Sequence, residues 1–316
     1  MSALNLADIQ VLLVEPNEKE RLPLHQGLLA RGIKGAAAVS SVEEAASIAR
    51  KRLIDMTIAD AELPAGDAIT FNRSIRVGQM GRNPFLVSVC TLANTLENVV
   101  RQAAHDGPDL VLAKPVTIGK LLDRLTSVIH SRPSFLVTDA YVGPDRPQIA
   151  RPQENATRVE VPNTLADKAL ERFDVNRAVS AIDAARSLVE RLALTQAAQT
   201  ISTLTHQIVN SFDTGTLDES ANPALSTLFD RSREIARRLK GTQEESVAEM
   251  CMSVMKVSVD LQRAIKSPAV KDVRLLQNLG MAIHMSITSE RQVEHLSTRI
   301  AKSVMEAKFR RVAKQS

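Results

Sequence analysis

Short apolar runs that alternate with helix-like stretches are the feature that most constrains how the first part of this chain can fold. Each run is followed by a polar turn and an amphipathic stretch, and the runs lie at residues 9–14, 35–39, 56–59, 85–89 and 110–112. This rhythm is typical of strands joined by helices, which assemble into a parallel sheet covered on both faces. We therefore predict an α/β domain with a five-stranded, doubly wound parallel sheet.

Polar residues follow four of these runs. Glu15 follows the first run, Asp60 the third, Thr91 the fourth and Lys114 the fifth. Doubly wound sheets bind ligands at the carboxyl ends of their strands, so we expect these side chains at one edge of the sheet. A carboxylate with a hydroxyl and an ammonium beside it suits phosphoryl transfer, because the carboxylate attacks phosphorus while the other two groups stabilise the phosphoryl oxygens.

The order and spacing of these residues resemble the receiver domains of bacterial two-component signalling over residues 8–132. The segment 60–64 and the Lys114-Pro115 pair belong to the same pattern. The resemblance implies a flavodoxin-like fold. It also implies that Asp60 accepts a phosphoryl group, that Thr91 contacts this group and that Lys114 neutralises it.

Two positions depart from the receiver pattern. The family has two adjacent acids at the end of its first strand, whereas this chain has Glu15 followed by Pro16, which cannot bind a cation. The resemblance implies Mg²⁺ as the cofactor, and Glu15, Asp60 and Glu62 are the remaining candidate ligands. Val111 stands where many receivers carry an aromatic residue whose rotamer reports activation. We therefore expect phosphorylation to be absent or much weakened, with the domain acting as a pseudo-receiver.

Beyond residue 132 the strand-helix rhythm ends. Prolines punctuate residues 133–163, which predicts an extended linker. Apolar residues then take helical spacing over residues 164–316, which predicts an all-α helical bundle of about four helices. The last helix is expected over residues 270–312, with an apolar stripe that comprises Leu276, Leu279, Ile283, Ile287, Val293, Leu296, Ile300 and Val304. A stripe of this length favours packing against a second copy, so we expect a homodimer.

Three outputs are open for the helical region. In the first, His206 lies opposite the apolar face of its helix and exchanges phosphate in a phosphorelay. In the second, residues 234–247 act as a DNA-binding helix-turn-helix, but Glu244, Glu245 and Glu249 would meet the DNA phosphates, so DNA is disfavoured as a partner. In the third, which we prefer, the bundle dimerises or binds a kinase, a phosphotransferase or a downstream effector under control of the pseudo-receiver.

Composition narrows the class of protein. Apolar residues make up 44% of the chain and charged residues 24%, as in soluble globular proteins. No apolar run is long enough to span a membrane, and residues 1–8 lack the features of a signal peptide. Cys90 and Cys251 fit a reducing compartment, so we expect a cytoplasmic protein. The sequence has no nucleophilic triad or phosphate-binding glycine loop, and we expect no enzyme activity.

Overall fold

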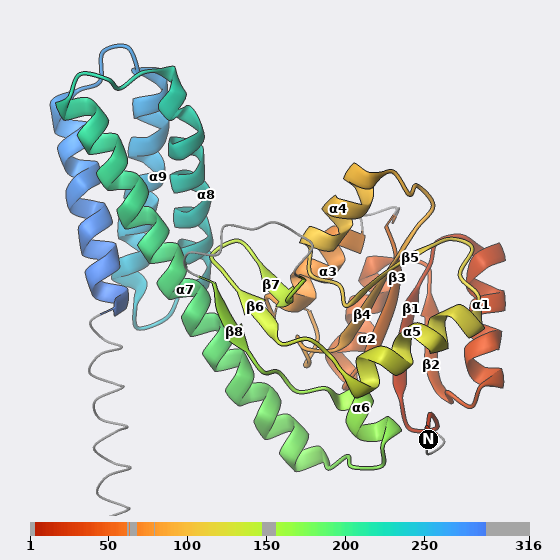
Figure 1. The fold of residues 1–316 in the computed structure, drawn as a ribbon. Coiled ribbons are helices and arrows are strands. Elements are labelled where there is room, and N and C mark those ends of the chain that lie inside the picture. The colour runs from red at the N-terminus through yellow and green to blue at the C-terminus, as the bar shows by residue number, and fades with distance from the viewer. Residues whose placement is uncertain (1–3, 62, 64–67, 79, 147–155, 289–316) are drawn as a thin grey trace, which may run out of the picture. The chain divides into compact units, whose positions relative to one another are not determined.

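The computed structural model describes residues 4–61, 63, 68–78, 80–146 and 156–288, and the chain divides into two units (Figure 1). Unit 1 is Met1–Leu192 and unit 2 is Ala193–Ser316. The boundary between the units falls inside the long helix α7 (Val175–Asp213).

A five-stranded parallel sheet forms the centre of unit 1, which confirms the fold predicted from the apolar runs. Its strands are β1 (Gln10–Val14), β2 (Gly35–Val39), β3 (Met56–Asp60), β4 (Val87–Leu92) and β5 (Leu110–Ala113). They are paired in the order β2-β1-β3-β4-β5, and every pairing is parallel. All residues of β3 and β4 are buried, which explains why these strands are continuous apolar runs with little polar alternation.

Helices cover both faces of this sheet (Figure 1). The first face carries α1 (Glu18–Ala30) and α5 (Ile118–His130), which share one core cluster. The second face carries α2 (Val42–Lys51), α3 (Ala68–Arg76) and α4 (Glu97–His105), which share another. The side chains of Asn17 and Thr117 cap the amino ends of α1 and α5. Because α1 follows β1 and α5 follows β5, each helix begins near the carboxyl end of the strand before it.

The segment that we expected to be an extended linker contains three short strands. They are β6 (Phe135–Val137), β7 (Val142–Pro144) and β8 (Thr157–Val159), and they form an antiparallel sheet in the order β7-β6-β8. Strands of three residues are too short to show a two-residue alternation, and Pro144 ends an edge strand, where a missing N–H is tolerated. Proline punctuation therefore did not distinguish this small sheet from a connector.

The helix α6 (Thr164–Ala169) follows the small sheet and belongs to unit 1. Its residues Leu165, Ala166 and Ala169 are buried in the same core cluster as α1 and α5. Lys168 forms an ion pair with the buried Asp55, with Nζ 2.7 Å from Oδ2. Unit 1 therefore extends well past residue 132, where the receiver resemblance ends.

The described residues of unit 2 form helices joined by short turns, as the spacing of apolar residues predicted. It comprises the second part of α7, the 3₁₀ turn η1 (Glu219–Ala221), α8 (Asn222–Leu239), α9 (Glu245–Arg263) and a helix over residues 270–288. These helices share one apolar core. Gln262 near the end of α9 donates to the hydroxyl of Ser226 in the first turns of α8, so the two helices pack antiparallel.

Residues 289–316 lie outside the described residues, and with them the predicted stripe positions Val293, Leu296, Ile300 and Val304. The stripe positions Leu276, Ile283 and Ile287 are buried in the core of unit 2, with Leu279 packed against it. Within the described part of the chain, no helix combines the length and the apolar character that crossing a bilayer requires.

Candidate functional site

Strand pairing brings the predicted site residues to one edge of the sheet. Asp60 is the last residue of β3, and it pairs in register with Thr91 near the end of β4. Lys114 directly follows β5, and its backbone N–H donates to the carbonyl of Leu92 at 2.8 Å. The carboxyl ends of three parallel strands therefore deliver a carboxylate, a hydroxyl and an ammonium to the same place, as the spacing of the sequence predicted.

The ammonium of Lys114 contacts three carboxylates. Its Nζ lies 2.7 Å from Glu15 Oε2, 2.8 Å from Glu20 Oε2 and 3.0 Å from Asp60 Oδ2. Burial lowers the pKa of Lys114, but the hydrogen bonds to Glu15, Glu20 and Asp60 raise it by more, so the pKa of Lys114 lies above its ordinary value. We call these four residues the lysine cluster. It is acidic overall, with three carboxylates around one cation.

The loop between β1 and α1 positions two of the three carboxylates of the lysine cluster, those of Glu15 and Glu20. Glu15 is buried, and its Oε1 accepts the backbone N–H of Asn17 at 2.9 Å. Asn17 in turn caps α1, and its Nδ2 donates to Glu20 Oε1 at 3.2 Å. Arg21 Nη1 donates to the carbonyls of Glu15 and Pro16. One short loop therefore positions both Glu15 and Glu20 against Lys114.

Asp60 has one oxygen in the lysine cluster and one outside it. Its Oδ2 accepts from Lys114, whereas its Oδ1 is buried without a hydrogen-bond partner among the described residues. The hydroxyl of Thr91 donates to the carbonyl of Ala59 at 3.3 Å. Buried polar atoms without partners are uncommon, and they mark positions where an incoming group can bond. Asp60 Oδ1 is therefore a buried acceptor that no described group satisfies.

A cavity of about 600 Å³ lies beside the lysine cluster. Its lining from α1 includes Glu20 and Leu24, and its lining from the segment after β5 includes Lys114, Val116 and Ile118. Sequence reasoning missed both this cavity and Glu20. The acidic first turn of α1 is a common helix signature, so it gave no sign of a role in the site.

The predicted Mg²⁺ ligands are only partly placed. Glu15 and Asp60 lie side by side, but Lys114 is bonded to one oxygen of each, and Pro16 offers no side-chain ligand. Glu62 lies outside the described residues. Among the described residues, no group of three or more acidic, histidine or cysteine side chains is arranged to hold a metal ion. The candidate Mg²⁺ ligands that the structure describes, Glu15 and Asp60, therefore share oxygens with Lys114, and Mg²⁺ binding here stays a prediction.

His206 belongs to unit 2 and is not part of the lysine cluster. It is exposed on α7, while Ile208 and Val209 are buried in the core of unit 2. The predicted orientation, with His206 pointing away from the apolar face, is therefore what the helix has. Its proposed role in phosphotransfer remains a prediction.

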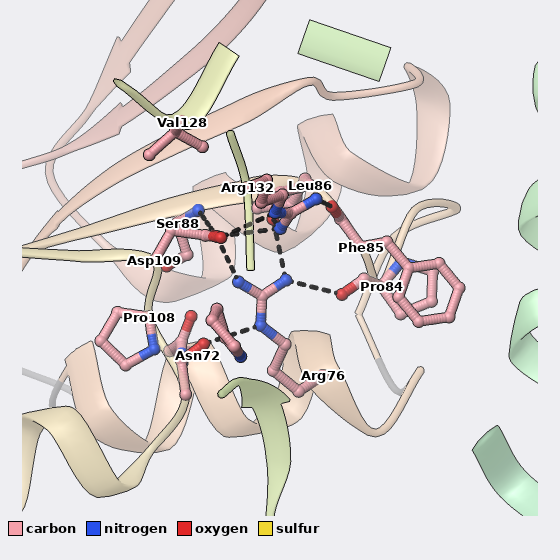
Figure 2. A network of polar contacts seen from close by, with 12 residues as sticks. Asn72, Arg76, Pro84, Phe85, Leu86, Ser88, Pro108, Asp109, Val128 and Arg132 are labelled. Carbon is pink, nitrogen blue, oxygen red and sulfur yellow. Dashed lines mark hydrogen bonds and ion pairs between the residues drawn. The ribbon is translucent and has the colours of Figure 1, made fainter. Parts of the chain in front are cut away.

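A second charged cluster lies at the opposite, amino ends of the strands, and Figure 2 shows it closely. Asp109 precedes β5, and its carboxylate accepts from Arg76 Nη2 at 2.8 Å, from Arg132 Nε at 2.7 Å and from the backbone N–H of Ser88 at 2.8 Å. Burial raises the pKa of Asp109, but the guanidiniums of Arg132 and Arg76 lower it by more, so the pKa of Asp109 lies below its ordinary value. We call Arg76, Asp109 and Arg132 the arginine cluster.

The arginine cluster joins the main sheet to the small sheet. Arg76 donates to the carbonyls of Pro84, Leu86 and Gly107, and Arg132 to those of Phe85, Leu86 and Pro162. Both guanidiniums also lie over the ring of Phe135 in β6, with Cζ 5.0 Å and 4.9 Å from the ring centroid. These contacts stabilise the packing of β6 against the ends of β4 and β5.

Comparisons with known proteins find similarity over part of the chain. No family model matches the chain. A probable chemotaxis protein CheY from Rhizobium etli is 27% identical over 120 residues, which cover 38% of this chain and 92% of that protein. The alignment therefore spans nearly the whole of the CheY protein and little more than a third of this chain.

Two solved structures are also similar to part of this chain. The receiver domain of a sensor histidine kinase from Pseudomonas aeruginosa, solved with a magnesium ion in its active-site cleft, is 26% identical with a TM-score of 0.35, covering 39% of this chain and 98% of that one. The chemotaxis protein CheY4 from Vibrio cholerae is 22% identical with a TM-score of 0.35, covering 38% and 98%.

Proposed function

We propose that the N-terminal domain is a response-regulator receiver domain in a response-regulator-like signalling protein, and that the two parts of the chain have separate roles. The receiver domain carries a weak phosphoacceptor at Asp60 and controls the helical unit. The helical unit is the output, which docks a signalling partner or a second copy of the chain.

The observation that carries the receiver part of this proposal is the contact between Lys114 Nζ and Asp60 Oδ2 at 3.0 Å, beside the unpartnered Oδ1. In the proposed step, a carboxylate oxygen of Asp60 attacks the phosphorus of a small phosphodonor. A P–O bond to Asp60 forms as the bond between phosphorus and the leaving group breaks, and the leaving group departs with its electron pair. Lys114 and Thr91 stabilise the phosphoryl oxygens.

Two features make Asp60 a weak acceptor in this proposal. Three carboxylates surround one ammonium, so an approaching phosphoryl group meets an excess of negative charge. Pro16 removes the acid that would help to hold a divalent cation against that charge. No step of the proposal passes through Mg²⁺, which the similar Pseudomonas receiver domain coordinates and which enters here only as a reagent in the test.

Exposed apolar side chains support a docking role for the helical unit. Met281 and Met285 lie one turn apart and are more than half exposed on the helix of residues 270–288, and Met252 is equally exposed on α9. Flexible methionine side chains adapt to varied partner surfaces. Light scattering tests the dimer form of this proposal, because a mass of 34.5 kDa at micromolar concentration would reject it.

Intact-mass spectrometry after incubation with acetyl phosphate and Mg²⁺ tests the acceptor role. We expect a slow, partial gain of one phosphoryl group, and its loss in Asp60→Asn. A phosphoryl group on His206 would instead support the second candidate, phosphotransfer, which is favoured by the exposure of this histidine on α7. Absence of any adduct on Asp60 at high donor concentration would reject the acceptor role.

A further inference from the structure

Glu20 is the one member of the lysine cluster that comes from a helix. It lies in the first turn of α1, and its Oε2 is 2.8 Å from Lys114 Nζ. The other two carboxylates, Glu15 and Asp60, follow or end strands of the central sheet. Glu20 is therefore the carboxylate of the lysine cluster whose position does not depend on a strand end.

Three carboxylates compete for the ammonium of Lys114. An ammonium has three N–H donors and no acceptor. Lys114 donates to Glu15 Oε2 at 2.7 Å and forms ion pairs with Glu20 Oε2 at 2.8 Å and with Asp60 Oδ2 at 3.0 Å. A phosphoryl oxygen on Asp60 therefore has to compete with these carboxylates for the donors of Lys114.

Exposure identifies which carboxylate is released most easily. The side chain of Glu20 is 46% exposed, against 5% for Glu15 and 7% for Asp60. A released Glu20 carboxylate gains water at once, whereas a released Glu15 would be a buried charge without its partner. The half-exposed pair between Glu20 and Lys114 contributes little free energy, so breaking it is inexpensive.

We propose that Glu20 is a displaceable carboxylate that occupies Lys114 until a phosphate-like anion on Asp60 takes its place. This inference rests on the proposed acceptor role of Asp60 and adds the regulation of that site. Glu20 is a positioning residue for Lys114: it keeps one N–H donor engaged, and it adds a negative charge beside the path of the phosphodonor. The low reactivity of Asp60 then has a local cause in addition to Pro16.

The first experiment compares the rate of Asp60 phosphorylation in full-length variants. Each protein is incubated with acetyl phosphate and Mg²⁺, and the phosphoryl group is followed by intact mass. Transfer forms the bond from phosphorus to Asp60 and releases acetate. We expect Glu20→Gln to raise the initial rate about two- to fivefold, the range that corresponds to a partly exposed ion pair.

Two matched variants separate the contact from the charge. Glu18→Gln removes a carboxylate from the same turn of α1, and Glu18 is exposed and forms no ion pair among the described residues. Its rate should stay within a factor of 1.5 of the wild type, about the smallest difference expected from one exposed charge. Glu20→Asp keeps the charge but shortens the side chain, so it should react nearly as fast as Glu20→Gln. A rate for Glu20→Gln equal to or below that of Glu18→Gln would overturn the inference.

A second readout does not depend on phosphorylation. Reductive methylation of Lys114, followed by peptide mass spectrometry, measures how firmly its ammonium is held. We expect faster methylation in Glu20→Gln than in Glu18→Gln. If no variant is phosphorylated, the acceptor role of Asp60 fails, and methylation alone decides on the Glu20 contact: equal rates in the two variants overturn it, and a faster rate in Glu20→Gln supports it.

Discussion

The lysine cluster and the arginine cluster lie at opposite ends of the same sheet and combine the same kinds of group in opposite proportions. The lysine cluster has one cation and three carboxylates, and it borders a cavity. The arginine cluster has one carboxylate and two cations, and the side chains of all three residues are at most 5% exposed. In the lysine cluster, Glu20 is exposed enough to exchange its contact with Lys114 for water or a ligand. In the arginine cluster, none of the three side chains is exposed enough to do so.

This difference separates the proposed acceptor site from a cluster that holds elements of the fold together. In the arginine cluster, each guanidinium bonds Asp109 and several backbone carbonyls, so the charges and most of their donors are satisfied by fixed groups. In the lysine cluster, Asp60 Oδ1 has no partner among the described residues, and Glu20 is half exposed. Mutations should therefore affect stability most at the arginine cluster and reactivity most at the lysine cluster.

The largest expected effect comes from Asp109→Asn. This change leaves two buried guanidiniums without their counter-charge, and we expect the free energy of unfolding to fall by about 3–5 kcal/mol. Denaturant unfolding at pH 7 measures it. Asp123→Asn, an exposed aspartate on α5, is the matched control and should change stability by less than about 0.5 kcal/mol. A loss below about 1 kcal/mol for Asp109→Asn would break the comparison.

The pH dependence of this loss follows from the lowered pKa of Asp109. A carboxyl group whose pKa is lowered by folding stabilises the protein at every pH above its pKa in the unfolded chain, which is near 3.8. This stabilisation is lost as the pH falls through the pKa of the group in the folded protein. The difference between wild type and Asp109→Asn should therefore stay constant from pH 7 down to about pH 5 and shrink only at lower pH. A difference that shrinks between pH 7 and pH 6 would contradict the lowered pKa.

Phe135→Leu should have the next largest effect. The ring of Phe135 is fully buried beneath both guanidiniums, so its loss removes packing and two cation–π contacts. We expect a loss of about 1–2 kcal/mol in the free energy of unfolding. Phe173→Leu is the control, because Phe173 is less buried and has one cation, Lys168, over its ring. Equal losses for the two variants would show that the arginine cluster adds nothing specific at Phe135.

Lys114→Met tests the other end of the sheet. Removing the ammonium leaves three carboxylates close together, but solvent reaches Glu20. We therefore expect the free energy of unfolding to fall by about 1–2 kcal/mol, a value between those typical of surface and of buried ion pairs. Because folding raises the pKa of Lys114, its contribution is fully present below the unfolded value of 10.5 and is lost as the pH rises through the higher folded value. The difference from wild type should persist at pH 9. Lys120→Met, on the exposed side of α5, is the control.

The two clusters also differ in how far the sequence predicts them. The apolar runs fix the strand ends, and strand ends of a parallel sheet share an edge, so Asp60, Thr91 and Lys114 follow from local patterns. The arginine cluster does not follow from local patterns. Arg76 and Asp109 are 33 residues apart, and neither lies in a sequence pattern that indicates which residue it contacts. The small sheet stayed hidden for a related reason, since its strands have three residues each.

The smallest effect on stability should come from Glu20→Gln, the variant with the sharpest expected effect on reactivity. Its ion pair is half exposed, so the free energy of unfolding should change by less than about 1 kcal/mol, and by no more than about 0.5 kcal/mol beyond the change in Glu18→Gln. Thermal or denaturant unfolding measures both. If Glu20→Gln is as stable as the wild type and is phosphorylated faster, Glu20 controls the reactivity of the site. Asp109 differs, because its substitution should lower the stability of the fold. If Glu20→Gln instead destabilised the fold as strongly as Lys114→Met, the carboxylate would be a structural partner of Lys114, and the two ends of the sheet would differ in degree alone.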